Sequence, residues 1–161
     1  HGDLSEGQMR ALYEHDKVKA MVNISHGEGF GLPLFEAARS ALPIISVGWS
    51  GQVDFLNFDD KDYFCKVSHT LQPVQETAVW DGVIERDSHW AYADQGSYKM
   101  SLRRVYKDYN SFVTLADELQ AKVDANFRDD VLFEKFVDQF GPHSNSESWL
   151  SEIEDIIKEY E

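Results

Sequence analysis

The chain has 161 residues, the length of about one domain, and its 42% hydrophobic and 13% aromatic residues suffice for a packed core rather than a disordered chain. The formal net charge of -14 argues against nucleic acid or an anionic membrane surface as the main partner, because both need basic patches, but it allows a small anionic ligand held by backbone N–H groups. The single cysteine, Cys65, excludes an intrachain disulfide. We find no signal peptide and no apolar run near the roughly 20 residues of a membrane helix, and we therefore expect a cytoplasmic location.

The chain begins with helical and strand patterns in alternation. Ser5 and Gln8 have the spacing of a capping box, and the apolar residues that follow predict an amphipathic helix over 5–16. The mostly apolar run 20–24 is typical of a buried strand that leads into a loop. Pro33 suits the first turn of a second helix, which we expect to continue to about residue 41.

The next segment continues this alternation. Residues 44–47 are rich in β-branched side chains and predict a second strand, residues 53–56 a short helix, and residues 63–67 a third strand. Strands that alternate with helices in this way favour a parallel sheet covered by helices. Residues 1–67 are therefore the expected βα core of an α/β fold.

The remaining chain is predicted to be mainly helical. Residues 68–96 are expected to be an irregular insertion or a hairpin, with Asp81-Gly82 as a candidate turn. Residues 97–161 carry apolar residues at helical spacing, which predicts helices. We expect the whole chain, residues 1–161, to be one domain. The four apolar faces are Tyr98, Leu102, Val105 and Tyr106; Phe112, Leu115, Ala116, Leu119 and Val123; Leu132, Phe133, Phe136, Val137 and Phe140; and Trp149, Leu150, Ile153, Ile156, Ile157 and Tyr160.

Three alternating glycines mark the candidate binding loop. Gly27, Gly29 and Gly31 follow a predicted strand and precede a predicted helix, so the backbone can come close to a ligand whose phosphate meets the helix start. A dinucleotide fingerprint would need a third glycine where Leu32 stands, and a P-loop would end in Gly-Lys-Ser/Thr, which is absent. The sequence therefore predicts a phosphate-bearing ligand at a loop of another kind.

Two glutamates near this loop indicate what else the ligand carries. A carboxylate at Glu28 would repel a bare phosphate, but it suits a sugar hydroxyl or a carbon that develops positive charge. Glu36, one turn into the predicted helix, could accept hydrogen bonds from ribose hydroxyls. Together, the loop and the two acids favour a ligand made of a sugar, a diphosphate and a nucleoside.

At these residues the sequence resembles the retaining glycosyltransferases of the GT-B architecture that carry a Glu-x7-Glu motif, the glycogen-synthase-like group. The motif runs from Glu28 to Glu36 with Gly-Phe-Gly-Leu-Pro inside it, and the resemblance covers about residues 3–67. It implies a Rossmann-like sheet with helices on both faces and transfer of a hexose, with retention, from a UDP-, GDP- or ADP-sugar without a metal. It also implies that the chain, which has no initiator methionine, is a piece lacking an N-terminal acceptor domain and its basic pair.

The resemblance also implies roles for individual residues. Glu28 would contact the donor sugar near the reacting carbon, and Glu36 would bind the ribose. The loop over 51–54 has Gln52 and Asp54 where many relatives carry Gly and Glu, so it receives no role. The backbone amides that would bind the sugar and the diphosphate are those of Gly29, Phe30, Gly31 and Leu32.

Other interpretations remain open. The same fold could serve as a non-catalytic module that binds a nucleotide or a sugar nucleotide, and an unrelated flavodoxin-like nucleotide binder is a third possibility. His26 lies beside the motif, but a lone histidine at a strand end is more often structural. The other histidines have no metal-ligand spacing, and we expect no metal site.

Overall fold

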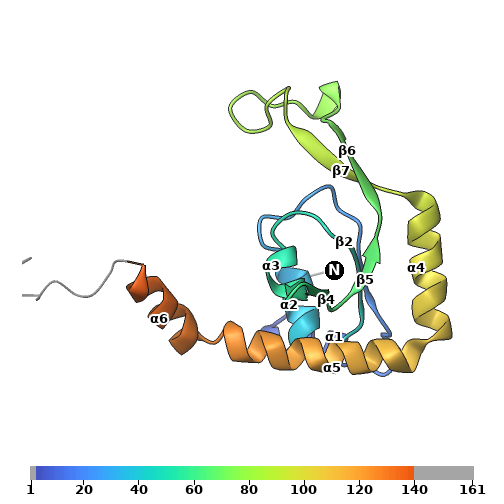
Figure 1. Ribbon diagram of the computed structural model, residues 1–161, viewed down its shortest axis with the longest axis vertical. Helices are drawn as coiled ribbons and strands as arrows, with labels where there is room; N and C mark the ends of the chain where they lie inside the picture. The colour runs from blue at the N-terminus through green and yellow to red at the C-terminus, as the bar shows by residue number, and fades with distance from the viewer. Residues whose placement is uncertain (1–2, 140–161) are drawn as a thin grey trace, which may run out of the picture. The chain divides into compact units, whose positions relative to one another are not determined.

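The computed structural model describes residues 3–139, and the chain divides after Asp124 into two compact units. The first unit is a mixed α/β arrangement with a three-stranded parallel sheet, two small antiparallel sheets and helices (Figure 1). The predicted apolar face over 149–160 lies outside the described residues. In chain order the elements are α1 (Glu6–Tyr13), β1 (Met21–Asn23), α2 (Leu32–Arg39), β2 (Ile44–Val47), α3 (Val53–Leu56), β3 (Asn57–Phe58), β4 (Lys61–Asp62), β5 (Cys65–Val67), β6 (His69–Pro73), η1 (Glu76–Ala78), β7 (His89–Ala93), α4 (Gln95–Lys107), α5 (Tyr109–Asn126) and α6 (Asp129–Asp138).

Helix α1 begins where the capping box predicts. The Ser5 hydroxyl accepts a hydrogen bond from the Gln8 backbone N–H at 3.3 Å, and the Gln8 side chain accepts one from the Ser5 N–H at 2.9 Å. These two bonds satisfy donors that a helix start otherwise leaves to water. The helix ends at Tyr13, the one residue of α1 that is buried.

The parallel sheet has the order β1-β2-β5, so its strands lie side by side in the order of the chain. Met21 pairs with Ile44, and Ile45 pairs with Cys65. We predicted a buried strand over 20–24, and this was wrong in one respect: β1 is an edge strand, and Val22 is 36% exposed. Only β2, which has a neighbour on each side, is buried along its whole length.

Helices α2 and α4 both pack against this sheet. Helix α2 contacts β1 and β2, and α4 contacts β5. Because every residue of β2 is buried, both of its faces are covered. One core cluster joins the sheet to α4 and α5 through Ile45, Val47, Cys65, Val67, Val105 and Phe112.

The stretch that the sequence left undecided is a hairpin. Strands β6 and β7 pair antiparallel from His69–Ala93 to Pro73–His89, and in Figure 1 this green ribbon leads into α4, in yellow. The candidate turn at Asp81-Gly82 also forms: Gly82 has φ +78°, and Trp80 and Ile84 make an isolated bridge around it.

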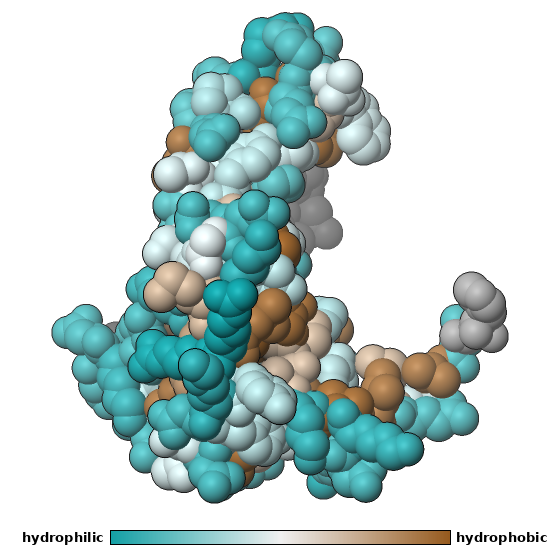
Figure 2. Space-filling view, turned by 90° about the vertical axis from the view of Figure 1, so that its right-hand side faces the viewer, coloured by the Kyte–Doolittle hydropathy of each residue, from teal (hydrophilic) through white to brown (hydrophobic). Residues whose placement is uncertain are grey.

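Helices α4 and α5 form where the sequence predicts helices, but their buried side chains match the predicted apolar faces only in part. Helix α5 buries Phe112, Ala116, Leu119 and Val123, as predicted. In α4 the predicted face was partly wrong, because Tyr106 is 86% exposed and Ser101 and Val105 are the buried residues. The surface on the side of α4, which Figure 2 shows, is mostly hydrophilic with smaller apolar patches.

Candidate functional site

The glycine loop lies between the end of β1 and the start of α2, as predicted. Gly31 is the N-cap of α2 and has φ +88°, a left-handed conformation that side chains other than glycine rarely adopt. A Cβ at Gly31 would also lie 3.3 Å from the Cβ of Gln52. Glycine at this position therefore sets the path of the chain into the helix.

A second loop, residues 50–52, holds the glycine loop in place. The Ser50 hydroxyl donates to the Glu28 carbonyl at 2.7 Å and accepts from the Glu28 N–H at 3.1 Å, and the Gly51 N–H donates to the same carbonyl at 3.0 Å. The two loops touch so closely that a Cβ on Gly51 would lie 1.9 Å from the Gly29 carbonyl oxygen. Sequence reasoning gave this loop no role, although Ser50-Gly51 is the signal of a close backbone approach.

The backbone donors at the start of α2 lie on two exposed residues, Gly29 and Leu32, and on the buried Gly31. Within residues 3–139, the N–H groups of Gly29, Gly31 and Leu32 donate to no protein acceptor. They lie on the turn into an eight-residue helix, where aligned peptide dipoles favour negative charge. This part of the loop can accept an anionic group without a basic side chain.

The Glu28 carboxylate is fixed by the end of β1. Its Oε1 accepts hydrogen bonds from Asn23 Nδ2 and from the Ser25 hydroxyl, both at 2.9 Å. Asn23 and Ser25 are site residues that sequence reasoning missed, and small polar residues directly after a strand were the available signal. The side chain of Glu28 is half-buried, so its carboxylate remains within reach of solvent.

The Glu36 carboxylate has a different neighbour, Tyr13. The Tyr13 hydroxyl donates to Glu36 Oε2 at 3.0 Å and links α1 to α2. Burial, followed by this hydrogen bond to a negative group, raises the pKa of Tyr13 to about 12. Tyr13 was not predicted as a site residue, because its contact with Glu36 depends on how α1 packs against α2.

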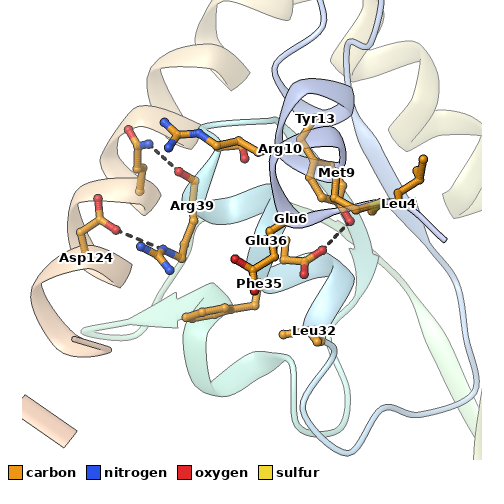
Figure 3. A pocket seen from close by; sticks show the side chains of 12 residues that line it. Leu4, Glu6, Met9, Arg10, Tyr13, Leu32, Phe35, Glu36, Arg39 and Asp124 are labelled. Atoms are coloured by element: carbon orange, nitrogen blue, oxygen red, sulfur yellow. Dashed lines mark hydrogen bonds and ion pairs between the residues drawn. The ribbon is translucent and has the colours of Figure 1, made fainter. Parts of the chain in front are cut away.

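A cavity of about 630 Å³ opens between α1, α2 and α5, and Glu36 is on its wall (Figure 3). Of the predicted site residues, Glu36 and Leu32 line this cavity, whereas Glu28, Gly29, Phe30 and Gly31 do not. The two glutamates of the motif therefore serve two adjoining regions rather than one cavity. The lining residues are Leu4, Glu6, Met9, Arg10, Tyr13, Leu32, Phe35, Glu36, Arg39, Ser40, Gln120 and Asp124.

Phe30 packs its ring behind the loop. Its ring centroid lies 5.1 Å from that of Phe35 and 5.0 Å from that of Phe55, which is fully buried. These contacts anchor the loop to the core through α2 and α3 and leave the backbone on the other side. Leu32, by contrast, is 58% exposed at the rim of the cavity.

His26 packs against the β6–β7 hairpin. Its ring stacks on Trp90 at 5.1 Å between centroids with planes 6° apart, and it lies 4.5 Å from the ring of Tyr92. The His26 carbonyl accepts the Ala91 N–H at 3.0 Å, and His26 Nδ1 lies 2.7 Å from the Ala91 carbonyl oxygen. The residue thus ties the motif loop to the β6–β7 hairpin.

Two further findings concern residues 3–139 as a whole. No helix among them is long and apolar enough to cross a membrane. No three or more of their His, Cys, Asp and Glu residues are grouped so that they could hold a metal ion.

Comparisons with protein-family models, with curated proteins and with solved structures each found no match for this chain.

Proposed function

We propose that this chain is the donor-binding lobe of a retaining GT-B glycosyltransferase, which moves a hexose from a nucleoside diphosphate sugar to an acceptor bound elsewhere. The observation that carries the proposal is the set of three unpartnered N–H groups at Gly29, Gly31 and Leu32, which in residues 3–139 have no protein acceptor. They lie between a glutamate fixed at the loop, Glu28, and a glutamate on a cavity wall, Glu36. This order matches a sugar, a diphosphate and a nucleoside.

In this proposal each part of the site has its own task. The helix start stabilises the diphosphate as negative charge builds on the leaving group, and no metal is required for that step. Glu28 supports the sugar, whose reacting carbon gains positive character in the transition state. Glu36 binds the ribose, and the cavity of about 630 Å³ has a volume typical of small-molecule sites.

The acidity of the chain adds support for a local anion site. With a formal net charge of -14, the protein as a whole repels an anionic ligand. Backbone N–H groups at a helix start act at short range and are suited to holding phosphate against that charge. The acceptor domain and a basic pair for the diphosphate would belong to the rest of a longer protein located in the cytoplasm.

The test is a calorimetric titration of the chain with UDP, GDP, ADP and their sugars. Gly29→Ala places a methyl group at the proposed diphosphate position, and the fold tolerates it because no atom lies within 4 Å of that Cβ. We expect at least one ligand to bind the wild type and to bind Gly29→Ala about tenfold more weakly, the equivalent of losing one good hydrogen bond to a charged group.

Gly7→Ala is the matched control, since its Cβ also has no atom within 4 Å and it lies outside the loop and the cavity lining. It should leave the affinity unchanged. The absence of binding by every ligand, in this chain and in the longer protein, would contradict the proposal.

A second candidate is a non-catalytic sugar-nucleotide-binding module. It is favoured by the two hydrogen bonds that Glu28 receives from Asn23 and Ser25, which give this carboxylate a structural task. Glu28→Ala in the full-length protein separates the two candidates. Loss of transfer with donor binding retained supports the enzyme with Glu28 in the catalytic step. Donor binding without any transfer in the wild type favours the binding module, and unchanged transfer in Glu28→Ala would contradict the role given to Glu28.

The strand order β1-β2-β5 leaves the flavodoxin-like alternative open. Rossmann-like and flavodoxin-like sheets both contain runs of consecutive strands that lie side by side, so the sequential order of these three strands fits either. The choice between them depends on the ligand: binding of a sugar nucleotide would favour the glycosyltransferase, and binding of a flavin nucleotide would favour the flavodoxin-like alternative.

A further inference from the structure

The phenol of Tyr13 is positioned to fix the orientation of Glu36. Tyr13 is the last residue of α1 and is only 8% exposed, and its hydroxyl reaches Glu36 Oε2 at 3.0 Å. Figure 3 shows Tyr13 and Glu36 facing each other from α1 and α2 along the cavity wall. A buried aromatic ring has little rotamer freedom, so the hydroxyl is a donor with a fixed place.

The two arginines that line the cavity pair with acids other than Glu36. Arg10 Nε pairs with Glu14 at 2.7 Å, and Arg39 Nε lies 3.6 Å from Asp124. Within residues 3–139, the Tyr13 hydroxyl is the only hydrogen-bond donor to the Glu36 side chain. The carboxylate is therefore oriented by a neutral group rather than by an ion pair.

This leaves one carboxylate oxygen ready to accept. Oε2 of Glu36 takes the Tyr13 hydrogen, and Oε1 has no protein partner among the described residues. The Tyr13 phenol is protonated at neutral pH, and burial raises its pKa further, to about 12, so it serves as the donor in this hydrogen bond. Glu36 thus presents a single free acceptor in a fixed direction.

We infer that Tyr13 is a positioning residue, which holds Glu36 so that Oε1 accepts a hydrogen bond from the ribose hydroxyls of a bound nucleoside diphosphate. The inference rests on the proposed function, because that function assigns the ribose to Glu36. A preoriented acceptor loses less conformational freedom when the ligand binds, and affinity for the ribose rises accordingly. Without the hydroxyl, Glu36 would have to be ordered by the ligand itself.

The test compares Tyr13→Phe with the wild type by calorimetry, using whichever of UDP, GDP and ADP binds best and its 2′,3′-dideoxy counterpart. Phenylalanine keeps the buried ring and removes only the hydroxyl. We expect the ribonucleotide to bind about fivefold more weakly to Tyr13→Phe, and the dideoxynucleotide to bind equally to both proteins. Tyr106→Phe, at a tyrosine that is 86% exposed, should change neither affinity.

A loss of purely structural origin would affect both ligands alike, so equal losses, or no loss, would overturn the inference. Glu36→Ala gives a second measurement: in that background no side-chain acceptor remains for Tyr13 to orient, and adding Tyr13→Phe should have no further effect on the ribonucleotide. A further loss of similar size there would also overturn it. A wild type that binds neither ligand would overturn the proposed function itself, a result distinct from any of these.

Discussion

Gly51 is the residue on which the shape of the motif loop depends most. A Cβ at this position would lie 1.9 Å from the carbonyl oxygen of Gly29, a backbone atom that cannot move aside without displacing the loop. We expect Gly51→Ala to lower the free energy of unfolding by about 2 kcal/mol or more, measured by urea denaturation. Gly29→Ala, made on the opposite side of the same contact, should change stability by less than about 1 kcal/mol.

Gln52 is a buried polar residue with an unmet acceptor. It is fully buried, its Nε2 donates to the Val47 carbonyl at 3.3 Å, and its Oε1 has no partner among residues 3–139. Gln52→Met keeps the shape and removes that acceptor, and the Ser46 hydroxyl still donates to the Val47 carbonyl. We predict a free energy of unfolding unchanged or raised by about 1 kcal/mol; a loss of more than about 1 kcal/mol would show that the amide contributes through a contact beyond these bonds.

Because of Tyr13, we expect the free energy of unfolding to vary with pH in the alkaline range. Its pKa is raised from 10.0 to about 12 in the folded protein, so its contribution is fully present below about pH 10 and is lost as pH rises through about 12. We predict that the stability advantage of the wild type over Tyr13→Phe is constant between about pH 7 and 9 and shrinks above about pH 10. Urea denaturation at each pH measures it, and an advantage that grows above pH 10 would contradict the assignment.

Sequence reasoning located the motif but not the residues that hold it. The Gly27–Gly31 loop and Glu36 could be found from spacing, because local order fixes where a loop meets a helix. The partners Ser50 and Tyr13 come from other elements and depend on tertiary packing, which spacing does not reveal. The separation of Glu28 from the cavity likewise follows from the position of α1.

Helix α1 supplies one wall of the cavity, and its stability rests on a local signal. We predict that Ser5→Ala, which removes the hydroxyl of the capping box, costs about 1 kcal/mol, seen as faster hydrogen exchange in the α1 amides. Ser5→Asp keeps an acceptor at the same place and should retain most of the stability. Equal exchange in the wild type and Ser5→Ala would mean that packing alone defines the helix start.

The elements that were predicted well have strong local signals. The capping box gave α1, Pro33 gave the start of α2, and β-branched residues gave β2. The pairing of β6 with β7 could not be read in the same way, because the paired residues His69 and Ala93 are far apart in the sequence. Tyr106 was assigned to an apolar face but is 86% exposed, because periodicity reports that a face is apolar, not that another element covers it.

At the scale of the whole molecule, every residue that lines the cavity belongs to the first unit, which ends at Asp124. A chain shortened to residues 1–128 keeps all of α5 and should retain the fold of the first unit. We predict that it binds nucleoside diphosphates within about twofold of the complete chain, measured by calorimetry. A loss of tenfold or more would mean that residues 129–161 contribute to the site.

The central claim is that one ligand spans the helix start and the cavity. The most direct measurement is the amide NMR spectrum of the chain during titration with UDP-, GDP- and ADP-sugars. The account predicts that one of them shifts the amides of Gly29, Gly31 and Leu32 together with those around Glu36 and Tyr13, with a single dissociation constant. Saturating ligand that leaves the amides of 29–32 unshifted, or shifts only residues outside both regions, would contradict it.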